Sequence, residues 1–237
     1  MICPKCKKNS YFLSDIKGKY LKCEKCNYTD LYADPNYDDY HEKRYSYKRK
    51  RDCLNDPLLR KIIELKIIDK NSMVLDYGCG AGDYSGFISS RTKNFVGVDI
   101  NVKKAKERFP GIKFVKISAQ EKKLPFPNET FDTIIAVNVI EHVRDFDNLL
   151  KEFSRVLKIG GKMFITTYDK DFVLHFIHND PTHVIEWNIL DFKRLLKKYF
   201  TVKKCFKYGS FFNYYPFNFL LVKFLKPELC LCVEKLS

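Results

Sequence analysis

Four cysteines near the start of the chain have the spacing of a metal site. They form two Cys-x-x-Cys pairs, Cys3 with Cys6 and Cys23 with Cys26, and sixteen residues separate the pairs. Each pair can chelate one ion from a tight turn, and four thiolates close a tetrahedral zinc site with no position left open for catalysis. The pattern therefore predicts a structural zinc ion, with a redox-active dithiol as the alternative.

Residues 1–33 would form the module that this zinc ion holds together. The stretches 11–16 and 19–22 predict a short hairpin around Lys17-Gly18. So few residues bury little apolar surface, and the metal would supply the folding free energy. Residues 34–57 are expected to be a linker and a cofactor-covering arm. Tyrosines alternate with basic residues in that arm, which suits nucleic-acid stacking or a plain helix packed on the next domain.

A glycine-rich loop is the second group of residues with chemical potential. Gly78, Gly80 and Gly82 follow a short apolar run, and Asp99 ends the next apolar run, nineteen residues after Gly80. Glycines let a ligand approach the backbone closely, and an acid at that distance can accept hydrogen bonds from ribose hydroxyls. The spacing differs from the G-x-G-x-x-G of dinucleotide-binding enzymes. Together these residues predict a ligand that contains adenosine.

Alternating strands and helices must position these residues. Helical periodicity covers residues 58–68, and a second helix is expected at 83–91. A third is expected after Asp99 and ends at Phe109, and a fourth is expected at 147–157. Strands are expected at 73–77, 95–98, 112–117, 131–137 and 162–167, the last preceded by a turn at Gly160-Gly161. Strands that alternate with helices indicate an α/β fold with a parallel sheet covered on both faces.

Four segments, 74–88, 96–100, 124–143 and 150–167, resemble in order and spacing the successive motifs of class I S-adenosylmethionine-dependent methyltransferases of the type 11 kind. The resemblance covers roughly residues 58–205 and implies a Rossmann-like, doubly wound and mostly parallel sheet. It implies a methyltransferase domain over 58–237, whose last strand, 229–237, is inserted antiparallel beside strand six. The first module resembles the zinc ribbons that precede methyltransferase domains acting on RNA or on small molecules.

The resemblance also implies where S-adenosylmethionine binds. Asp76 would orient its ammonium group, Asp99 would bind the ribose hydroxyls, and Ile100 would pack on the adenine. The remaining residues are the loop glycines, which would line the cofactor with backbone, Ser118 and Ala119 at the adenine edge, and Asn138 and Val139, which would close over the cofactor. Many relatives have Asp where Ser118 stands, so an adenine contact through Gln120 or backbone groups is the alternative.

Methyl transfer from a sulfonium requires an acceptor aligned with the methyl group, and a general base only where the acceptor loses a proton. The candidates for catalysis are Glu141, His142 and His183. Capping or packing is the alternative role for His142. Trp187 is either a wall of the acceptor site or the residue that holds down the following helix.

Residues 211–225 are unusually aromatic and form most of an insertion, 211–228. They are expected to cover a hydrophobic acceptor or to contact a membrane surface or a second subunit, and an ordinary buried helix is the alternative. No uncharged stretch reaches the roughly 20 residues of a transmembrane helix. The start of the chain lacks a secretory signal, and nine cysteines without a disulfide pattern suit a reducing compartment, so a cytoplasmic location is expected.

The net charge of +14 lies at the two ends of the chain. Residues 1–51 hold 13 Lys and Arg against 7 Asp and Glu, residues 190–237 hold 10 against 3, and the middle is nearly neutral. This distribution suits a partner-facing patch or a lysine-rich solvated surface.

Three functions are compatible with the sequence. The resemblance favours a methyltransferase with a small-molecule, sugar or lipid-like acceptor, because the motifs of base-methylating enzymes are absent. An RNA methyltransferase that docks rRNA or tRNA through the ribbon and the basic ends is the second possibility, and a non-catalytic cofactor-binding partner is the third.

Overall fold

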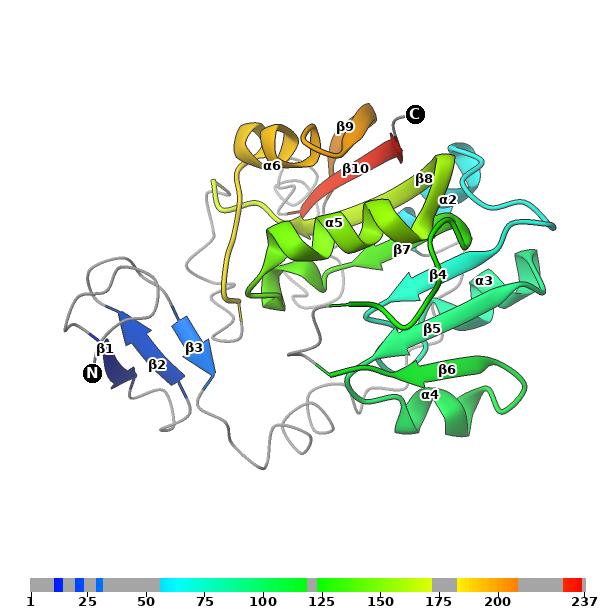
Figure 1. Ribbon diagram of the computed structural model, residues 1–237, viewed down its shortest axis with the longest axis horizontal. Coiled ribbons are helices and arrows are strands. Elements are labelled where there is room, and N and C mark those ends of the chain that lie inside the picture. The colour runs from blue at the N-terminus through cyan, green and yellow to red at the C-terminus, as the bar shows by residue number, and fades with distance from the viewer. Residues whose placement is uncertain are drawn as a thin grey trace, which may run out of the picture.

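The computed structural model describes residues 56–118, 123–171, 183–208 and 228–235, with three short strands nearer the start of the chain. Seven strands form the main sheet: β4 (Val74–Tyr77), β5 (Phe95–Asp99), β6 (Lys113–Lys116), β7 (Phe131–Val137), β8 (Leu157–Tyr168), β9 (Phe200–Tyr208) and β10 (Glu228–Lys235). Their spatial order is β6-β5-β4-β7-β8-β10-β9 (Figure 1).

The direction of the strands confirms the predicted fold class. The pairs from β6 through β8 are all parallel, whereas β10 runs antiparallel to both of its neighbours, β8 and β9. The sheet is therefore Rossmann-like and doubly wound, and its last strand is the antiparallel one. Because β10 is reversed, its first residue, Glu228, pairs with Tyr168 at the end of β8.

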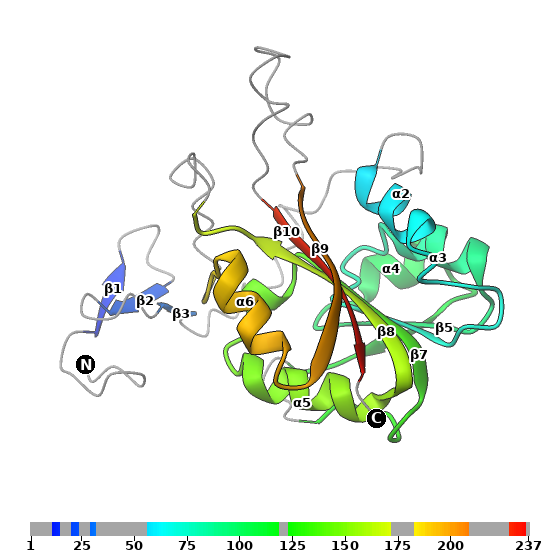
Figure 2. The same cartoon turned by 90° about the horizontal axis from the view of Figure 1, so that it is seen from above.

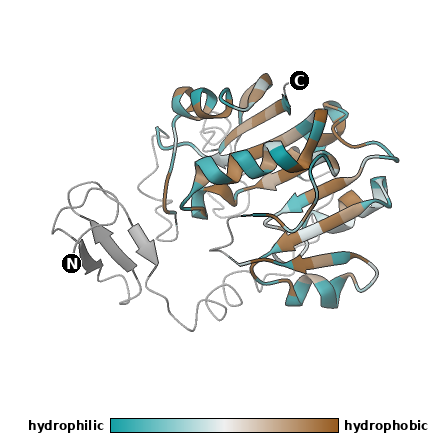
Figure 3. Cartoon of the chain, viewed as in Figure 1, coloured by the Kyte–Doolittle hydropathy of each residue, from teal (hydrophilic) through white to brown (hydrophobic). Residues whose placement is uncertain are grey.

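Helices cover both faces of this sheet. The helices are α2 (Pro57–Glu64), α3 (Ser85–Arg91) and α4 (Lys103–Arg108) on one face, and α5 (Phe146–Val156) and α6 (Ile189–Leu196) on the other (Figure 2). Each face has its own cluster of buried apolar side chains. The strands between them are largely apolar while the helices carry hydrophilic outer surfaces (Figure 3), as expected for a sheet buried on both sides.

Side-chain caps fix where three helices begin. The Asp56 carboxylate accepts hydrogen bonds from the Leu58 and Leu59 amides, and Pro57 occupies the first helical position, where its missing N–H costs nothing. Asp145 caps α5 and Asn188 caps α6 in the same way. Each cap satisfies an amide of the first turn that has no partner within the helix.

Two of the expected elements differ from the structure. The helix expected over 58–68 ends at Glu64, because Lys66 adopts a left-handed conformation with φ 47° that turns Ile67 into the core. The turn expected at Gly160-Gly161 is a bulge inside β8. Gly160 has φ 71°, and the pairing advances by five residues on β8, from Leu157 to Lys162, for two residues on β7.

A separate three-stranded antiparallel sheet is formed by β1 (Tyr11–Ser14), β2 (Tyr20–Cys23) and β3 (Thr29–Leu31). Its first two strands confirm the expected hairpin. Cys23 is the last residue of β2, whereas Cys3, Cys6 and Cys26 lie outside the described residues. Zinc binding therefore stays a prediction. The arm before Asp56 and the aromatic segment 211–225 also lie outside the described residues, and no helix among those described is long and apolar enough to cross a membrane.

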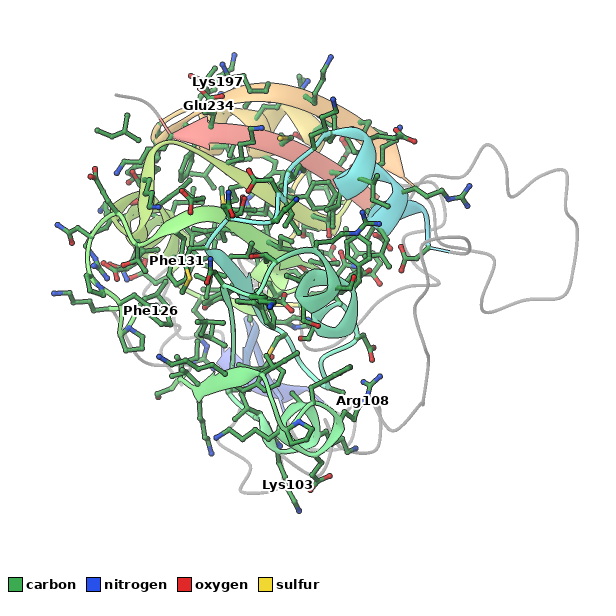
Figure 4. All side chains as sticks on the ribbon, turned by 90° about the vertical axis from the view of Figure 1, so that its right-hand side faces the viewer. Lys103, Arg108, Phe126, Phe131, Lys197 and Glu234 are labelled. Carbon is green, nitrogen blue, oxygen red and sulfur yellow. The ribbon has the colours of Figure 1, made fainter. Side chains whose placement is uncertain are left out.

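Aromatic pairs join the helices and loops to the sheet. Phe126 lies edge-on to Phe131 of β7, with ring centroids 4.9 Å apart (Figure 4), and Phe153 of α5 lies edge-on to Tyr77 of β4 at 5.0 Å. Such pairs stabilise a fold beyond the apolar area that they bury. Phe153 is fully buried and faces the strand that leads into the glycine loop.

We expect Phe153→Ala to lower the free energy of unfolding by about 3–5 kcal/mol, because the cavity cannot collapse between a helix and a sheet. Urea unfolding followed by circular dichroism measures the loss. Ile159→Ala is the control, since Ile159 is 60% exposed at the β8 bulge and should cost less than about 0.5 kcal/mol. Equal losses for the two variants would contradict this description of the core.

Candidate functional site

The candidate site lies where the parallel strands end. The carboxyl ends of β4, β5, β6, β7 and β8 meet at one edge of the sheet, and the strand order reverses between β4 and β7. Open α/β sheets bind ligands outside this reversal point, because the loops from the two central strands diverge there. The predicted cofactor residues lie at or directly after the carboxyl ends of four of these strands.

The glycine loop is anchored over the end of β5. The amides of Gly78 and Cys79 both donate to the Val98 carbonyl, at 2.8 and 3.0 Å. Gly78 has φ 74°, and a Cβ there would lie 2.3 Å from Cγ2 of Val139. Only glycine therefore fits where the ends of β4 and β7 approach each other, and the predicted loop and Val139 are in direct contact.

Gly80 is different, because a Cβ at this position would meet no atom within 4 Å. Its amide donates to Oδ2 of Asp99 at 2.8 Å, and the Asn101 amide donates to Oδ1 of Asp99 at 3.0 Å. These two amides fix the carboxylate in place. The space in front of Gly80 is where a ligand can approach the backbone while Asp99 lies beside it.

Asp76 is a buried acid on β4, 3% exposed, and its Oδ2 accepts a 3.4 Å hydrogen bond from the Ser85 hydroxyl. Burial raises the pKa of Asp76, the hydrogen bond from Ser85 opposes this shift, and the negative charges of Asp99 and Asp83 add to it, which gives a pKa of about 7. Asp83 is paired with Arg108 at 2.7 Å. The Asp76 and Asp99 carboxylates make this loop unfavourable for a pyrophosphate and favourable for a ligand with positive charge.

The other predicted cofactor residues surround this edge. Ile100 is half-buried after β5, and Ser118 is exposed after β6. Asn138 has φ 48°, and its amide and its side-chain oxygen both bond to the Thr166 hydroxyl, at 3.1 and 2.7 Å. Ala119 lies outside the described residues. The predicted residues that the structure describes thus all lie at the carboxyl ends of β4, β5, β6 and β7.

The three predicted catalytic residues also lie together. Glu141 and His142 belong to the 3₁₀ turn η1 (Ile140–His142) that follows β7, and His183 approaches from a distant segment. One ligand atom from each side chain lies within 4.8 Å of the other two. The rings of His142 and His183 are 5.1 Å apart. We call these three residues the Glu-His-His cluster.

Glu141 is fully buried in this cluster. Its Oε2 accepts a hydrogen bond from the Thr167 hydroxyl at 3.1 Å, and its Oε1 has no hydrogen-bond partner among the described residues. Burial raises the pKa of Glu141 to about 7, the His183 imidazole opposes this shift, and Glu228 adds to it. A buried oxygen without a partner is costly and is typical of a site that binds a ligand.

His183 is held by side-chain and backbone contacts. Its Nδ1 is 2.7 Å from Oε1 of Glu186, and its ring centroid is 5.0 Å from that of Tyr168. The Glu141 carbonyl accepts the Val184 amide at 2.8 Å, so the segment of His183 is tied to η1. Trp187 is buried and packs on Phe146 and Phe192, with ring centroids 4.7 and 5.5 Å away. This geometry supports the anchoring role of Trp187.

Sequence reasoning missed the residues that support the predicted ones. Ser85 contacts Asp76, Thr167 contacts Glu141, and Glu186 contacts His183. The spacing of three residues between His183 and Glu186 could have predicted their contact from the sequence. The contact of Thr167 with Glu141 could not be predicted in this way, because it depends on the pairing of β7 with β8. Cys79, between Gly78 and Gly80, is buried, and burial raises the pKa of its thiol well above the usual range.

Comparisons with known proteins agree with this arrangement. Residues 75–165 match the family described as a methyltransferase domain. The chain is 34% identical over 143 residues to an uncharacterized protein of Methanocaldococcus jannaschii. This match covers 57% of this chain and 60% of that protein. It is 35% identical over 104 residues to a ubiquinone biosynthesis O-methyltransferase of Colwellia psychrerythraea, covering 41% of this chain and 42% of that enzyme.

A solved structure of an S-adenosylmethionine-dependent methyltransferase from Archaeoglobus fulgidus has the same fold, with a TM-score of 0.61 and 19% identity over 84% of this chain and all of that one. The chain spans about half the length of the curated relatives that it matches. The domain match supports S-adenosylmethionine as the cofactor and confirms the resemblance to class I methyltransferases.

Asp76 gives a pH-dependent prediction. The pKa of Asp76 rises from its ordinary value of 3.8 to about 7 in the folded chain, so the folded state binds this proton more tightly than the unfolded state does. The free energy of unfolding that this proton contributes is present at low pH and is lost as the pH rises from about 4 to 7. In the absence of cofactor, the free energy of unfolding should fall between pH 5 and pH 8 in the native chain and in Asp76→Asn. The fall should be smaller in Asp76→Asn by about 1–3 kcal/mol, because the asparagine does not titrate.

Urea unfolding at the two pH values tests this prediction. Glu107→Gln, exposed on α4, is the control and should change the free energy of unfolding by less than about 0.5 kcal/mol at either pH. Parallel losses in Asp76→Asn and the native chain would show that Asp76 is not a strained buried acid.

Proposed function

We propose, on the premise that residues 75–165 belong to a class I S-adenosylmethionine-dependent methyltransferase domain, that this protein methylates a small-molecule, sugar or lipid-like acceptor. The observation that carries the methyltransferase part of this proposal is the glycine loop, which is open in front of Gly80 and flanked by the carboxylates of Asp76 and Asp99. The similarity to the Colwellia O-methyltransferase favours a hydroxyl group as the acceptor.

The residues present fit this cofactor. S-adenosylmethionine supplies an activated methyl group on a positively charged sulfonium, and it also carries an ammonium group and a ribose. The Asp76 carboxylate, which is buried and weakly hydrogen-bonded, would bind the ammonium group. The Asp99 carboxylate, which two amides hold in place, would accept hydrogen bonds from the ribose hydroxyls. A cationic ligand offsets the cost of burying Asp76 in its charged form.

The acceptor would bind beside the Glu-His-His cluster. Val139, which touches the glycine loop, is followed directly by η1, so the cofactor side and the cluster are adjacent along the chain. Residues on both sides are fixed by hydrogen bonds to β8, through Thr166 and Thr167. This rigid placement suits a reaction in which alignment supplies much of the rate. A hydroxyl acceptor must also lose its proton, and the cluster supplies titratable groups for that.

Asp99→Ala should abolish measurable binding of S-adenosylmethionine in calorimetry, since it removes the carboxylate that Gly80 and Asn101 hold in place. Binding should stay unchanged in Glu107→Gln. If Asp99→Ala keeps the affinity of the native chain, the cofactor site is wrong.

Transfer of labelled methyl from S-adenosylmethionine into a cell extract tests the acceptor class. We expect label in the metabolite or lipid fraction. Label confined to RNA would support the second candidate, which the exposed Lys197, Lys203 and Lys204 of the basic C-terminal region favour electrostatically. Cofactor binding with no labelled fraction would support a non-catalytic partner.

We also propose a structural zinc ion on Cys3, Cys6, Cys23 and Cys26. The small sheet β1-β2-β3 supports it, because Cys23 ends a strand paired with Tyr11 and so few residues need a metal to fold. Plasma emission spectrometry should find one zinc per chain, reduced to a small fraction in Cys23→Ser. Cys205→Ser, with a half-buried thiol on β9, is the control and should keep the zinc. Equal zinc in both variants would refute the site.

A further inference from the structure

We propose that the Glu-His-His cluster binds a divalent first-row metal ion on the acceptor side of the site. The inference rests on the proposed function, and it deepens that function by restricting the acceptor to compounds with a hydroxyl group. One carboxylate and two imidazoles are a donor set that proteins use for ions such as Mn²⁺, Fe²⁺ and Zn²⁺.

The geometry of the cluster is close to that of a bound ion. One donor atom from each of Glu141, His142 and His183 lies within 4.8 Å of the other two. Ligand atoms at about 2.0–2.2 Å from a common ion lie roughly 3–4 Å apart, so only small side-chain rotations are needed. The cluster is also assembled from two segments, η1 and the start of 183–187, which the Glu141 carbonyl joins through the Val184 amide.

The buried carboxylate is the second, independent observation. Glu141 is fully buried, and its Oε1 has no hydrogen-bond partner among the residues that the structure describes. Glu228, at the reversed start of β10, adds negative potential at this site. An anionic oxygen in such a place destabilises the fold unless a cation or a proton satisfies it. A metal ion coordinated by Oε1 removes this cost.

Neighbouring side chains already hold two ligands in the way that metal sites require. Glu186 lies 2.7 Å from Nδ1 of His183, and a hydrogen bond from Nδ1 to this carboxylate leaves the lone pair on Nε2. Thr167 donates to Oε2 of Glu141 and fixes the direction of Oε1. Carboxylate–imidazole and hydroxyl–carboxylate contacts of this kind orient metal ligands and raise their basicity.

A metal ion here would act on the acceptor. Three protein ligands leave coordination positions open, and a hydroxyl oxygen bound in one of them has a lowered pKa. Its O–H bond then breaks with the electron pair left on oxygen, and the proton passes to water. His142 and His183 would in that case be ligands, and no separate general base would be required.

The probe is Mn²⁺, because it prefers harder ligands than thiolates. It should therefore not compete for the N-terminal cysteines, which prefer zinc. Electron paramagnetic resonance of the full chain, with loss of the free Mn²⁺ signal as readout, should show one ion bound per chain. The affinity should fall by more than tenfold in Glu141→Gln and in His183→Gln. In Glu186→Gln, which keeps all three ligands, it should fall by about 10–100-fold. Glu107→Gln should bind as the native chain does.

Two results would overturn the proposal: no stoichiometric Mn²⁺ binding, or binding that Glu141→Gln and His183→Gln both leave unchanged. Circular dichroism of each variant verifies its fold, and His183→Gln provides the test if Glu141→Gln does not fold. The titration needs neither cofactor nor acceptor, so it succeeds or fails independently of the proposed methyl transfer. Methyl transfer that is insensitive to chelators, with no Mn²⁺ bound, would leave the methyltransferase intact and point to direct proton transfer by the imidazoles.

Discussion

Parallel pairing of β4 with both β5 and β7 is the constraint on which the rest of the structure depends. It brings the glycine loop, Asp99 and η1 to one edge, and it forces the ends of β4 and β7 so close that residue 78 has to be glycine. The reversed direction of β10 then places Glu228 at the same edge, beside the end of β8. Residues far apart in the chain thus become neighbours through the pairing of the strands.

This edge of the sheet contains buried carboxyl groups that lower the free energy of unfolding. Asp76 and Glu141 are both buried acids whose pKa values burial raises to about 7, one at the proposed cofactor site and one at the proposed acceptor site. A chain selected only for stability would replace them with apolar residues, because burying an incompletely paired carboxylate is unfavourable. The positively charged ligands proposed for the two sites would compensate for these acids, and binding and folding would then be thermodynamically linked.

The sequence predicts much of the fold because its signals are local. Strand 131–137 was predicted with its correct bounds, and Asp99 was placed at a strand end by the apolar run 95–98 that precedes it. What failed depends on contacts across the sheet or on single backbone angles: the early end of α2 at Lys66 and the bulge at Gly160. In the site, the ligand-facing residues carry recognisable types and spacing, whereas Thr167 and Glu228 become relevant only once the strand register is known.

The bulge in β8 lies at the end of the strand that is away from the site. The extra residues around Gly160 are accommodated before the register resumes at Lys162, and Ile159 is exposed to solvent there. The inner side of the bulge is closely packed, because a Cβ on Gly161 would lie 2.8 Å from the Lys158 carbonyl oxygen. A fluorescent label attached at position 159 would therefore report from solvent and leave Thr166 and Thr167 in place.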